Sequence, residues 1–205
     1  MLRPIPFESD LDSLSIAPPV SRELAAMRAR IQAFQDCWEE HHAAQFVAAD
    51  YELVFRAMTW IQKTQALIGN RFLEWGCGFA TVACLATELG WSSFAVEAHR
   101  DLIAQAKRTI QEWPAQVSLH HGNFLPRGTE QLADDPTLPS LSHEGSSAYE
   151  AWEMTLDEFA IVYSYPWPGE ATFHEDVFAE HAEYGAILLM FVGPNEVQAY
   201  RKVRR

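Results

Sequence analysis

The chain has 205 residues, 48% of them hydrophobic, which is enough for one domain with a full core, and no apolar run approaches the roughly twenty residues of a membrane span. Its formal net charge of -13 disfavours nucleic acid as a partner, because proteins that hold nucleic acid usually neutralise phosphates with Lys and Arg. Three cysteines without metal-ligand spacing, and an N-terminus without a secretory signal, lead us to expect a cytoplasmic protein with no membrane partner.

The first fifty residues predict an arm followed by a helix. Residues 1–20 hold four prolines and show no sustained hydrophobic period, so we expect a loose arm or strap there. Ser21 is a candidate N-cap for a helix whose apolar residues recur at helical spacing as far as Trp38. We expect residues 1–50 to precede the main domain, residues 51–205, within a single domain overall.

A strand, a tight turn and a helix are predicted between residues 71 and 90. Asp50 is a candidate N-cap for the amphipathic helix that precedes them, at residues 51–67. The short apolar run at residues 72–75 suits a buried strand, and a helical pattern resumes at residues 82–89. Gly76 and Gly78 lie between the two. Such a turn needs residues without a side chain, because its backbone adopts unusual dihedrals and a ligand must approach it closely.

The strand and helix pattern then repeats. Residues 93–97 predict a second strand, residues 102–110 a helix and residues 117–123 a third strand. We therefore expect an α/β fold: a doubly wound, mostly parallel, Rossmann-like sheet with helices on both faces and two helices before the first of these strands.

The second half of the chain begins with a proline-rich polar segment, residues 125–147, which we interpret as a surface loop. A short helix is expected near residues 148–156, a buried strand at 159–165, a helix at 170–184 closed by Gly185, and a strand at 186–192. The remaining residues leave room for one short strand, so we expect a shortened C-terminal sheet edge. The basic residues after position 200 are interpreted as a solvated tail.

Two alternative kinds of site fit the sequence poorly. The nicotinamide fingerprint Gly-x-Gly-x-x-Gly would place its third glycine at Thr81, so that match fails. The adjacent histidine pairs, His41-His42 and His120-His121, point their side chains apart on a helix or a strand, and no carboxylate completes a metal site. We expect no metal.

The turn resembles motif I of class I S-adenosylmethionine-dependent methyltransferases, in which an acidic residue precedes Gly-x-Gly-x-(Gly/Ala). The matching residues are Glu74, Gly76, Gly78 and Ala80. Glu97 ends the second strand about twenty residues after the first glycine, where this fold class places a ribose-binding acid. Asn123 follows the third strand, where the family usually has an Asp or Asn that contacts adenine.

The resemblance implies S-adenosyl-L-methionine as cofactor, with S-adenosyl-L-homocysteine as product. It places the turn against the methionine moiety, Glu97 on the ribose hydroxyls and Asn123 on adenine, with Ala98 and Phe124 flanking the ring. The cofactor-binding residues expected on this basis are Glu74, Gly76, Cys77, Gly78, Glu97, Ala98, Asn123 and Phe124. Cys77 is interpreted as a small residue that fills the turn.

The segment Tyr165-Pro-Trp-Pro168 follows the fourth of these strands, where the family often carries a substrate-facing motif. It partly resembles the Asn/Asp-Pro-Pro-aromatic motif of amino-group methyltransferases and the Asp-Pro-Trp-Pro segment of transfer-RNA guanine methyltransferases. Tyr165 and Trp167 are therefore the candidate catalytic residues. The alternative is that these two aromatic residues merely close the end of the sheet.

Three functions remain open at this point. The first is a methyltransferase of unknown acceptor, a small molecule or a protein side chain. The second is a protein that binds the cofactor within a methyltransferase fold but transfers nothing. The third, an oxidoreductase with a Rossmann domain, is opposed by Thr81 and by the absence of a second catalytic domain.

Overall fold

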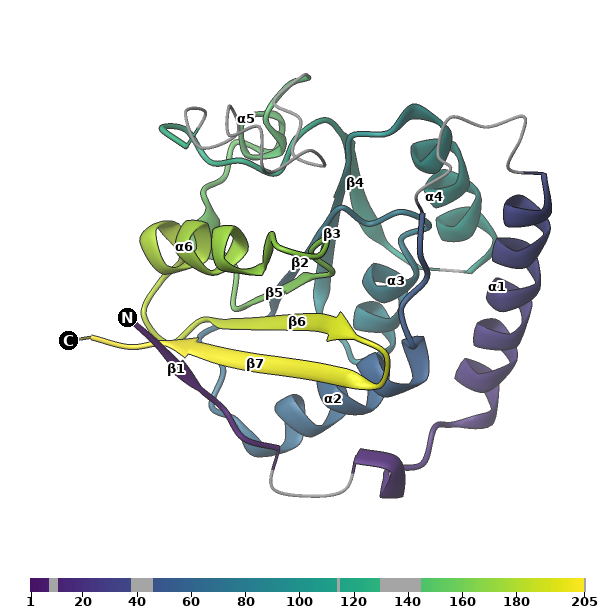
Figure 1. Ribbon diagram of the computed structural model, residues 1–205, viewed down its shortest axis with the longest axis horizontal. Coiled ribbons are helices and arrows are strands. Elements are labelled where there is room, and N and C mark those ends of the chain that lie inside the picture. Colours follow the sequence, from purple (N-terminus) through teal and green to yellow (C-terminus); the bar gives the residue numbers. More distant parts are fainter. Residues whose placement is uncertain (8–10, 38–45, 114, 130–144, 205) are drawn as a thin grey trace.

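A computed structural model describes residues 1–7, 11–37, 46–113, 115–129 and 145–204 (Figure 1). Its strands are β1 (Leu2–Pro4), β2 (Arg71–Trp75), β3 (Ser92–Glu97), β4 (Val117–His121), β5 (Ile161–Ser164), β6 (Ile187–Gly193) and β7 (Glu196–Lys202). Its α-helices are α1 (Pro18–Asp36), α2 (Tyr51–Thr64), α3 (Thr81–Glu88), α4 (Arg100–Glu112), α5 (Ala148–Trp152) and α6 (Ala171–His181), with 3-10 turns at Leu11–Ser13 and Leu156–Glu158.

The seven strands form one sheet in the order β1-β7-β6-β5-β2-β3-β4. The five strands from β6 to β4 are parallel, and β7 is antiparallel to both of its neighbours, β6 and β1. β5 and β3 both pair with β2, so the strand order reverses at β2. The predicted doubly wound, mostly parallel sheet is confirmed.

Helices cover both faces of the sheet, and the strands alternate between two cores. Phe72 of β2 packs in the core shared with α1, α2 and α3, whereas Leu73 packs in the core shared with α5 and α6. Buried apolar side chains on both faces of a strand are typical of a parallel sheet with helices on either side. We refer to the two sides as the α2/α3 face and the α6 face.

The N-terminal residues depart from the predicted loose arm. Leu2–Pro4 form β1, which pairs with Tyr200, Arg201 and Lys202 of β7 at the edge of the sheet (Figure 1). The C-terminal part of the chain supplies one strand beyond β6, as expected, and the N-terminus supplies the edge strand next to it. Nothing in a three-residue segment with a proline predicts a strand, because its pairing comes entirely from a partner distant in sequence.

The helix boundaries correct two predictions and confirm a third. Ser21 does not cap α1, which begins at Pro18 after Ala17; proline suits the first helical turn because its missing N–H has no partner there anyway. Trp38 lies outside the described residues. Asp50 does cap α2, accepting hydrogen bonds from the backbone N–H groups of Glu52 and Leu53.

The C-terminal basic residues are structural, and the solvated-tail interpretation is wrong for the two in β7. Arg201 donates to the carbonyl oxygens of Ala66 and Gly185. Lys202 is buried and donates to the carbonyl oxygens of Glu180 and Ala182, at the C-terminal end of α6. A cation there satisfies carbonyl groups that have no partner within the helix. α6 ends at His181, so the prediction that Gly185 caps it is wrong.

Candidate functional site

The glycine turn lies at the carboxyl end of β2 and has left-handed backbone at three positions: φ is +65° at Gly76, +53° at Gly78 and +56° at Ala80. Gly76 is exposed, and a Cβ added there would meet nothing within 4 Å. The backbone N–H of Cys77 donates to the carbonyl oxygen of Val96, which ties the turn to β3 at 2.9 Å. The turn is thus held by a hydrogen bond to β3, and it is open to an approaching ligand at Gly76.

Gly78 is closed by a neighbouring side chain instead. A Cβ at Gly78 would lie 2.4 Å from the ring of Phe46, and that ring also packs at 5.1 Å on Phe79. The carbonyl oxygen of Phe46 accepts a hydrogen bond from Gln35 of α1. The segment before α2 therefore covers the second glycine of the turn.

Glu97, at the end of β3, touches the turn directly. Its Oε2 accepts a 2.7 Å hydrogen bond from the N–H of Gly78, and its Oε1 accepts a 2.8 Å bond from the N–H of His99. Burial raises the pKa of this carboxyl, and the two backbone donors oppose the rise. The structure thus brings the predicted ribose-binding acid and the glycine turn together at one point.

Glu74, the acid before the turn, is buried and faces α3. Its Oε2 accepts a 2.7 Å hydrogen bond from the N–H of Ala83, one of the unpaired donors in the first turn of that helix. Burial raises the pKa of Glu74 well above its ordinary value, and the charge of Glu97 adds to the effect. Cys77 is also buried, which raises the pKa of its thiol well above the usual range, as expected of a residue that fills space.

The residues after β4 also lie at the carboxyl ends of the strands, but the polar side chain of Asn123 already makes hydrogen bonds within the protein. The side-chain amide of Asn123 donates to the carbonyl oxygen of Gly145 and accepts from the N–H of Leu125, so it holds two loop segments together. Ala98 is exposed. Phe124 stacks on Trp75, with ring centroids 4.8 Å apart. Most of the segment 125–147, namely residues 130–144, lies outside the described residues.

The candidate catalytic aromatics differ in exposure. Tyr165 is half-buried, and its ring meets Phe191 edge-on at 4.8 Å. Trp167 is 39% exposed. Both follow β5 at the carboxyl edge of the sheet, where Trp75 of β2 pairs in register with Ser164. One of the two is therefore partly packed, and the other is available at the surface.

Sequence reasoning missed a buried polar network on the α6 face. Ser164 Oγ lies 2.6 Å from Nδ1 of His174, and burial lowers the pKa of His174 to about 4. The indole N–H of Trp75 donates to the hydroxyl of Tyr149 at 3.0 Å. The detectable signal was polarity at buried positions, since Ser164 ends a strand predicted to be buried on both faces.

The histidine pairs contribute no metal arrangement in the part of the chain that is described. His120 contacts Ser146 and His121 contacts the carbonyl oxygen of Ala98, so the adjacent rings have different partners. His41 and His42 lie outside the described residues. Within the described residues, no group of three His, Cys, Asp or Glu side chains is arranged to hold a metal ion.

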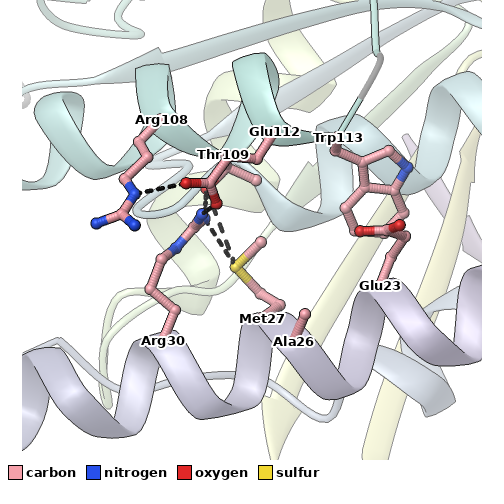
Figure 2. A pocket seen from close by; sticks show the side chains of 8 residues that line it. All are labelled: Glu23, Ala26, Met27, Arg30, Arg108, Thr109, Glu112 and Trp113. Atoms are coloured by element: carbon pink, nitrogen blue, oxygen red, sulfur yellow. Dashed lines mark hydrogen bonds and ion pairs between the residues drawn. The ribbon is translucent and has the colours of Figure 1, made fainter.

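A hollow of about 230 Å³ lies between α1 and α4, and none of the predicted site residues lines it (Figure 2). Arg30 reaches across from α1 to hydrogen-bond Thr109 and Glu112, and Glu112 also pairs with Arg108 at 2.7 Å (Figure 2). These ion pairs connect the two helices. We interpret the hollow as part of their packing.

In the described part of the chain, no helix combines the length and apolar character that crossing a membrane requires.

Comparison with known proteins identifies the fold. No protein-family model matches the chain, and no curated protein sequence matches it. A protein from Corynebacterium glutamicum shares the fold over 95% of this chain and 94% of its own, at 11% identity and a TM-score of 0.57. A methyltransferase from Geobacter sulfurreducens covers 94% of each chain at 11% identity and a TM-score of 0.52.

A third structure is an RNA methyltransferase from Salinibacter ruber in complex with S-adenosyl-L-homocysteine, similar over 76% of this chain and 92% of its own, at 13% identity and a TM-score of 0.50. At these identities the likeness concerns the fold. The chain has the Rossmann-like fold of class I methyltransferases, which the motif resemblance predicted.

Proposed function

We propose that the protein is an S-adenosyl-L-methionine-dependent methyltransferase of unknown acceptor. The observation that carries the proposal is the contact between Glu97 and the glycine turn, where the carboxylate accepts from the N–H of Gly78 at 2.7 Å. Two sequence features separated by about twenty residues thereby form one site, at the sheet edge where open α/β folds bind nucleotides.

The residues present fit this cofactor. Gly76 is exposed with open space beside it, so a methionine moiety can approach the backbone there. Each carboxylate oxygen of Glu97 accepts one backbone hydrogen bond, which leaves further lone pairs for two ribose hydroxyls. Bound S-adenosyl-L-methionine would supply an activated methyl group on a sulfonium.

The chain's own contribution is alignment. Methyl transfer needs the acceptor, methyl and leaving sulfur in line, so fixed walls can supply much of the rate without a dedicated base. We assign the acceptor wall to Tyr165 and Trp167, of which Trp167 has the exposure that contact with an acceptor requires. The net charge of -13 favours a small molecule or a protein side chain over nucleic acid as acceptor.

Calorimetry with S-adenosyl-L-homocysteine tests the cofactor assignment. Glu97→Ala should weaken binding about a hundredfold or more, because two hydroxyl bonds to a charged group contribute roughly 1.5–3 kcal/mol each. Glu183→Ala is the control. Glu183 is an exposed acid on the turn before β6, so it lies at the amino ends of the parallel strands, away from the glycine turn at their carboxyl ends. Equal affinities for the two variants would remove the ribose assignment.

Transfer is tested by the formation of S-adenosyl-L-homocysteine with candidate acceptors. Trp167→Ala should leave cofactor affinity within a few-fold and abolish transfer. Its stability should fall by less than the loss of about 3–5 kcal/mol that truncating a fully buried aromatic causes, because the side chain is 39% exposed. A loss of about 3–5 kcal/mol would mean that Trp167 packs like a core aromatic. Binding without transfer to any acceptor would favour a cofactor-binding protein.

A further inference from the structure

A second hollow, of about 370 Å³, lies on the α2/α3 face beside the β1 edge of the sheet. β1 and β7 form one side of it, and the C-terminal end of α2 forms the other (Figure 1). Its polar lining residues are Arg3, Thr64, Gln65 and Arg201, and Trp60 contributes an aromatic wall. Arg201 pairs with the first residue of β6, so the hollow lies at the amino ends of the parallel strands, away from the glycine turn.

Two arginines lie opposite each other at this hollow. Arg3 of β1 pairs directly with Arg201 of the antiparallel strand β7, so both side chains leave the sheet on the same face, with Cβ atoms about 4.5–5.5 Å apart. Like charges that are directly opposite in a strand pair are destabilising. Burial lowers the pKa of Arg201, and the charge of Arg3 adds to the effect. The strand pair therefore brings two positive charges together at an energetic cost.

No carboxylate compensates these two charges in the part of the chain that is described. None of the described residues that line the hollow is acidic, and neither arginine forms an ion pair with a described Asp or Glu. Arg56 and Arg71, by contrast, each pair with a glutamate. In a chain with a net charge of -13, this hollow is a local region of positive charge that attracts anions.

Arg201 is held in place by uncharged oxygen atoms. Its Nη1 donates to the carbonyl oxygens of Ala66 and Gly185, and its Nη2 donates to the side-chain oxygen of Gln65 at 3.0 Å. The amide of Gln65 in turn donates to the hydroxyl of Thr64. Among the described residues, these bonds use three of the five N–H donors of the guanidinium group. The remaining donors are fixed in direction, so a ligand can bind them with little further loss of side-chain entropy.

We propose that this hollow binds a small molecule through an oxyanion group, a phosphate or a carboxylate, held between Arg3 and Arg201. Guanidinium groups present parallel N–H donors that match the oxygen atoms of both anions. A bound anion would also offset the repulsion between the two arginines. A volume of about 370 Å³ is in the range of small-molecule sites, so the hollow has room for more than the anion alone, against the ring of Trp60. The inference does not depend on the proposed function.

Calorimetry with inorganic phosphate and with acetate tests the site, at an ionic strength held constant with sodium chloride. The wild-type protein should bind at least one of the two, and the tighter of them identifies the group. Arg3→Gln should bind it about tenfold more weakly, because hydrogen bonds between charged groups are among the stronger ones. Arg22→Gln is the matched control, since it removes the same charge from an exposed arginine of α1 that does not line the hollow. It should bind as the wild-type protein does.

Thermal unfolding separates an external anion from an acidic group of the chain itself. In buffer without phosphate or carboxylate, Arg3→Gln should leave the melting temperature unchanged or raise it, because it removes one of two opposed like charges. Added phosphate or acetate should raise the melting temperature of the wild-type protein more than that of Arg3→Gln. If Arg3→Gln melted at a lower temperature than Arg22→Gln in anion-free buffer, Arg3 would already be paired within the protein, which would contradict the inference.

Three further results would overturn it. The first is the absence of binding of both anions to the wild-type protein. The second is equal weakening by Arg3→Gln and Arg22→Gln, which would mean that anions respond to the net charge alone. The third is competition between the anion and S-adenosyl-L-homocysteine, which would place the anion at the glycine turn. The affinity of Arg3→Gln for S-adenosyl-L-homocysteine should equal that of the wild-type protein, so failure of this inference leaves the proposed function untouched.

Discussion

Two tyrosines buried on opposite faces of the sheet differ in how their hydroxyl groups are satisfied. Tyr149, on the α6 face, accepts a hydrogen bond from Trp75, and nearby Ser164 pairs with His174. Tyr163, on the α2/α3 face, has no partner among the described residues and lies beside Glu74. Completed pairs stabilise the fold by themselves. An unpaired buried hydroxyl is energetically unfavourable, so the two faces differ in how completely their polar groups are satisfied.

The two faces also respond oppositely to pH. On the α6 face, burial lowers the pKa of His174 to about 4, so the unfolded chain takes up a proton first as the pH falls. On the α2/α3 face, burial raises the pKa of Glu74 and of Glu97, so the folded chain holds its protons longer as the pH rises. Acid should therefore act against one face and alkali against the other.

The largest expected stability effect concerns His174. The stability that its neutral form contributes is complete above a pH of about 6.5, the ordinary pKa of histidine, and is lost as the pH falls toward 4. The loss should reach about 3 kcal/mol. Urea unfolding at pH 7 and pH 4.5 should show a smaller difference for His174→Asn than for the wild-type protein. If the unfolding free energy of both proteins depended on pH to the same extent, His174 would not be the group that makes the α6 face sensitive to acid.

A smaller effect is expected at Glu74. Its folded pKa is raised, so its contribution to stability is present below the ordinary pKa of 4.5 and is lost as the pH rises through the folded value. Glu74→Gln keeps an oxygen for the N–H of Ala83 and removes the charge. We expect it to be more stable than wild type at pH 8.5, with a smaller difference at pH 5, because a buried charged carboxylate is unfavourable. Thermal unfolding measures this; a less stable variant at pH 8.5 would contradict it.

The smallest effect is expected within the turn, at Gly76. Alanine there must adopt a φ of +65°, which costs about 1 kcal/mol, but its methyl group meets nothing within 4 Å. Gly78→Ala carries the same strain and also collides with Phe46, so it should be the less stable of the two variants. Melting temperatures compare them directly. Equal values would mean that Phe46 moves away freely, and that the α2/α3 face is open at both glycines.

Most predictions from sequence held where a signal is local, although Ser21 and Gly185 do not form the predicted caps. Hydrophobic period found β2 and α3, the glycines marked the turn between them, and Asp50 capped α2 as expected. They failed where a segment depends on a distant partner. β1 is too short to show a period, and Lys202 looked like a solvated cation until the carbonyl groups at the end of α6 were seen beside it.

In the candidate site, too, the features with a local sequence signal were predicted, and those that depend on contacts between distant segments were not. The sequence predicted that Gly76, Gly78 and Glu97 share one edge, and the structure places Glu97 in contact with the turn. The position of Tyr163 beside Glu74 was not predicted, because Tyr51 and Tyr163 fit the apolar pattern of a helix face and a buried strand. A tyrosine satisfies that pattern as well as a phenylalanine does.

By itself, then, the sequence determined the order of strands and helices, the left-handed turn and the acid that follows it, since each depends on residues close together in the chain. Only the tertiary structure decided that the N-terminus completes the sheet, that Phe46 covers Gly78, and that Tyr163 remains unpaired beside Glu74. These outcomes depend on which groups meet across the sheet. Neither hydrophobic period nor spacing carries that information, because a buried polar atom is defined by its neighbours in space.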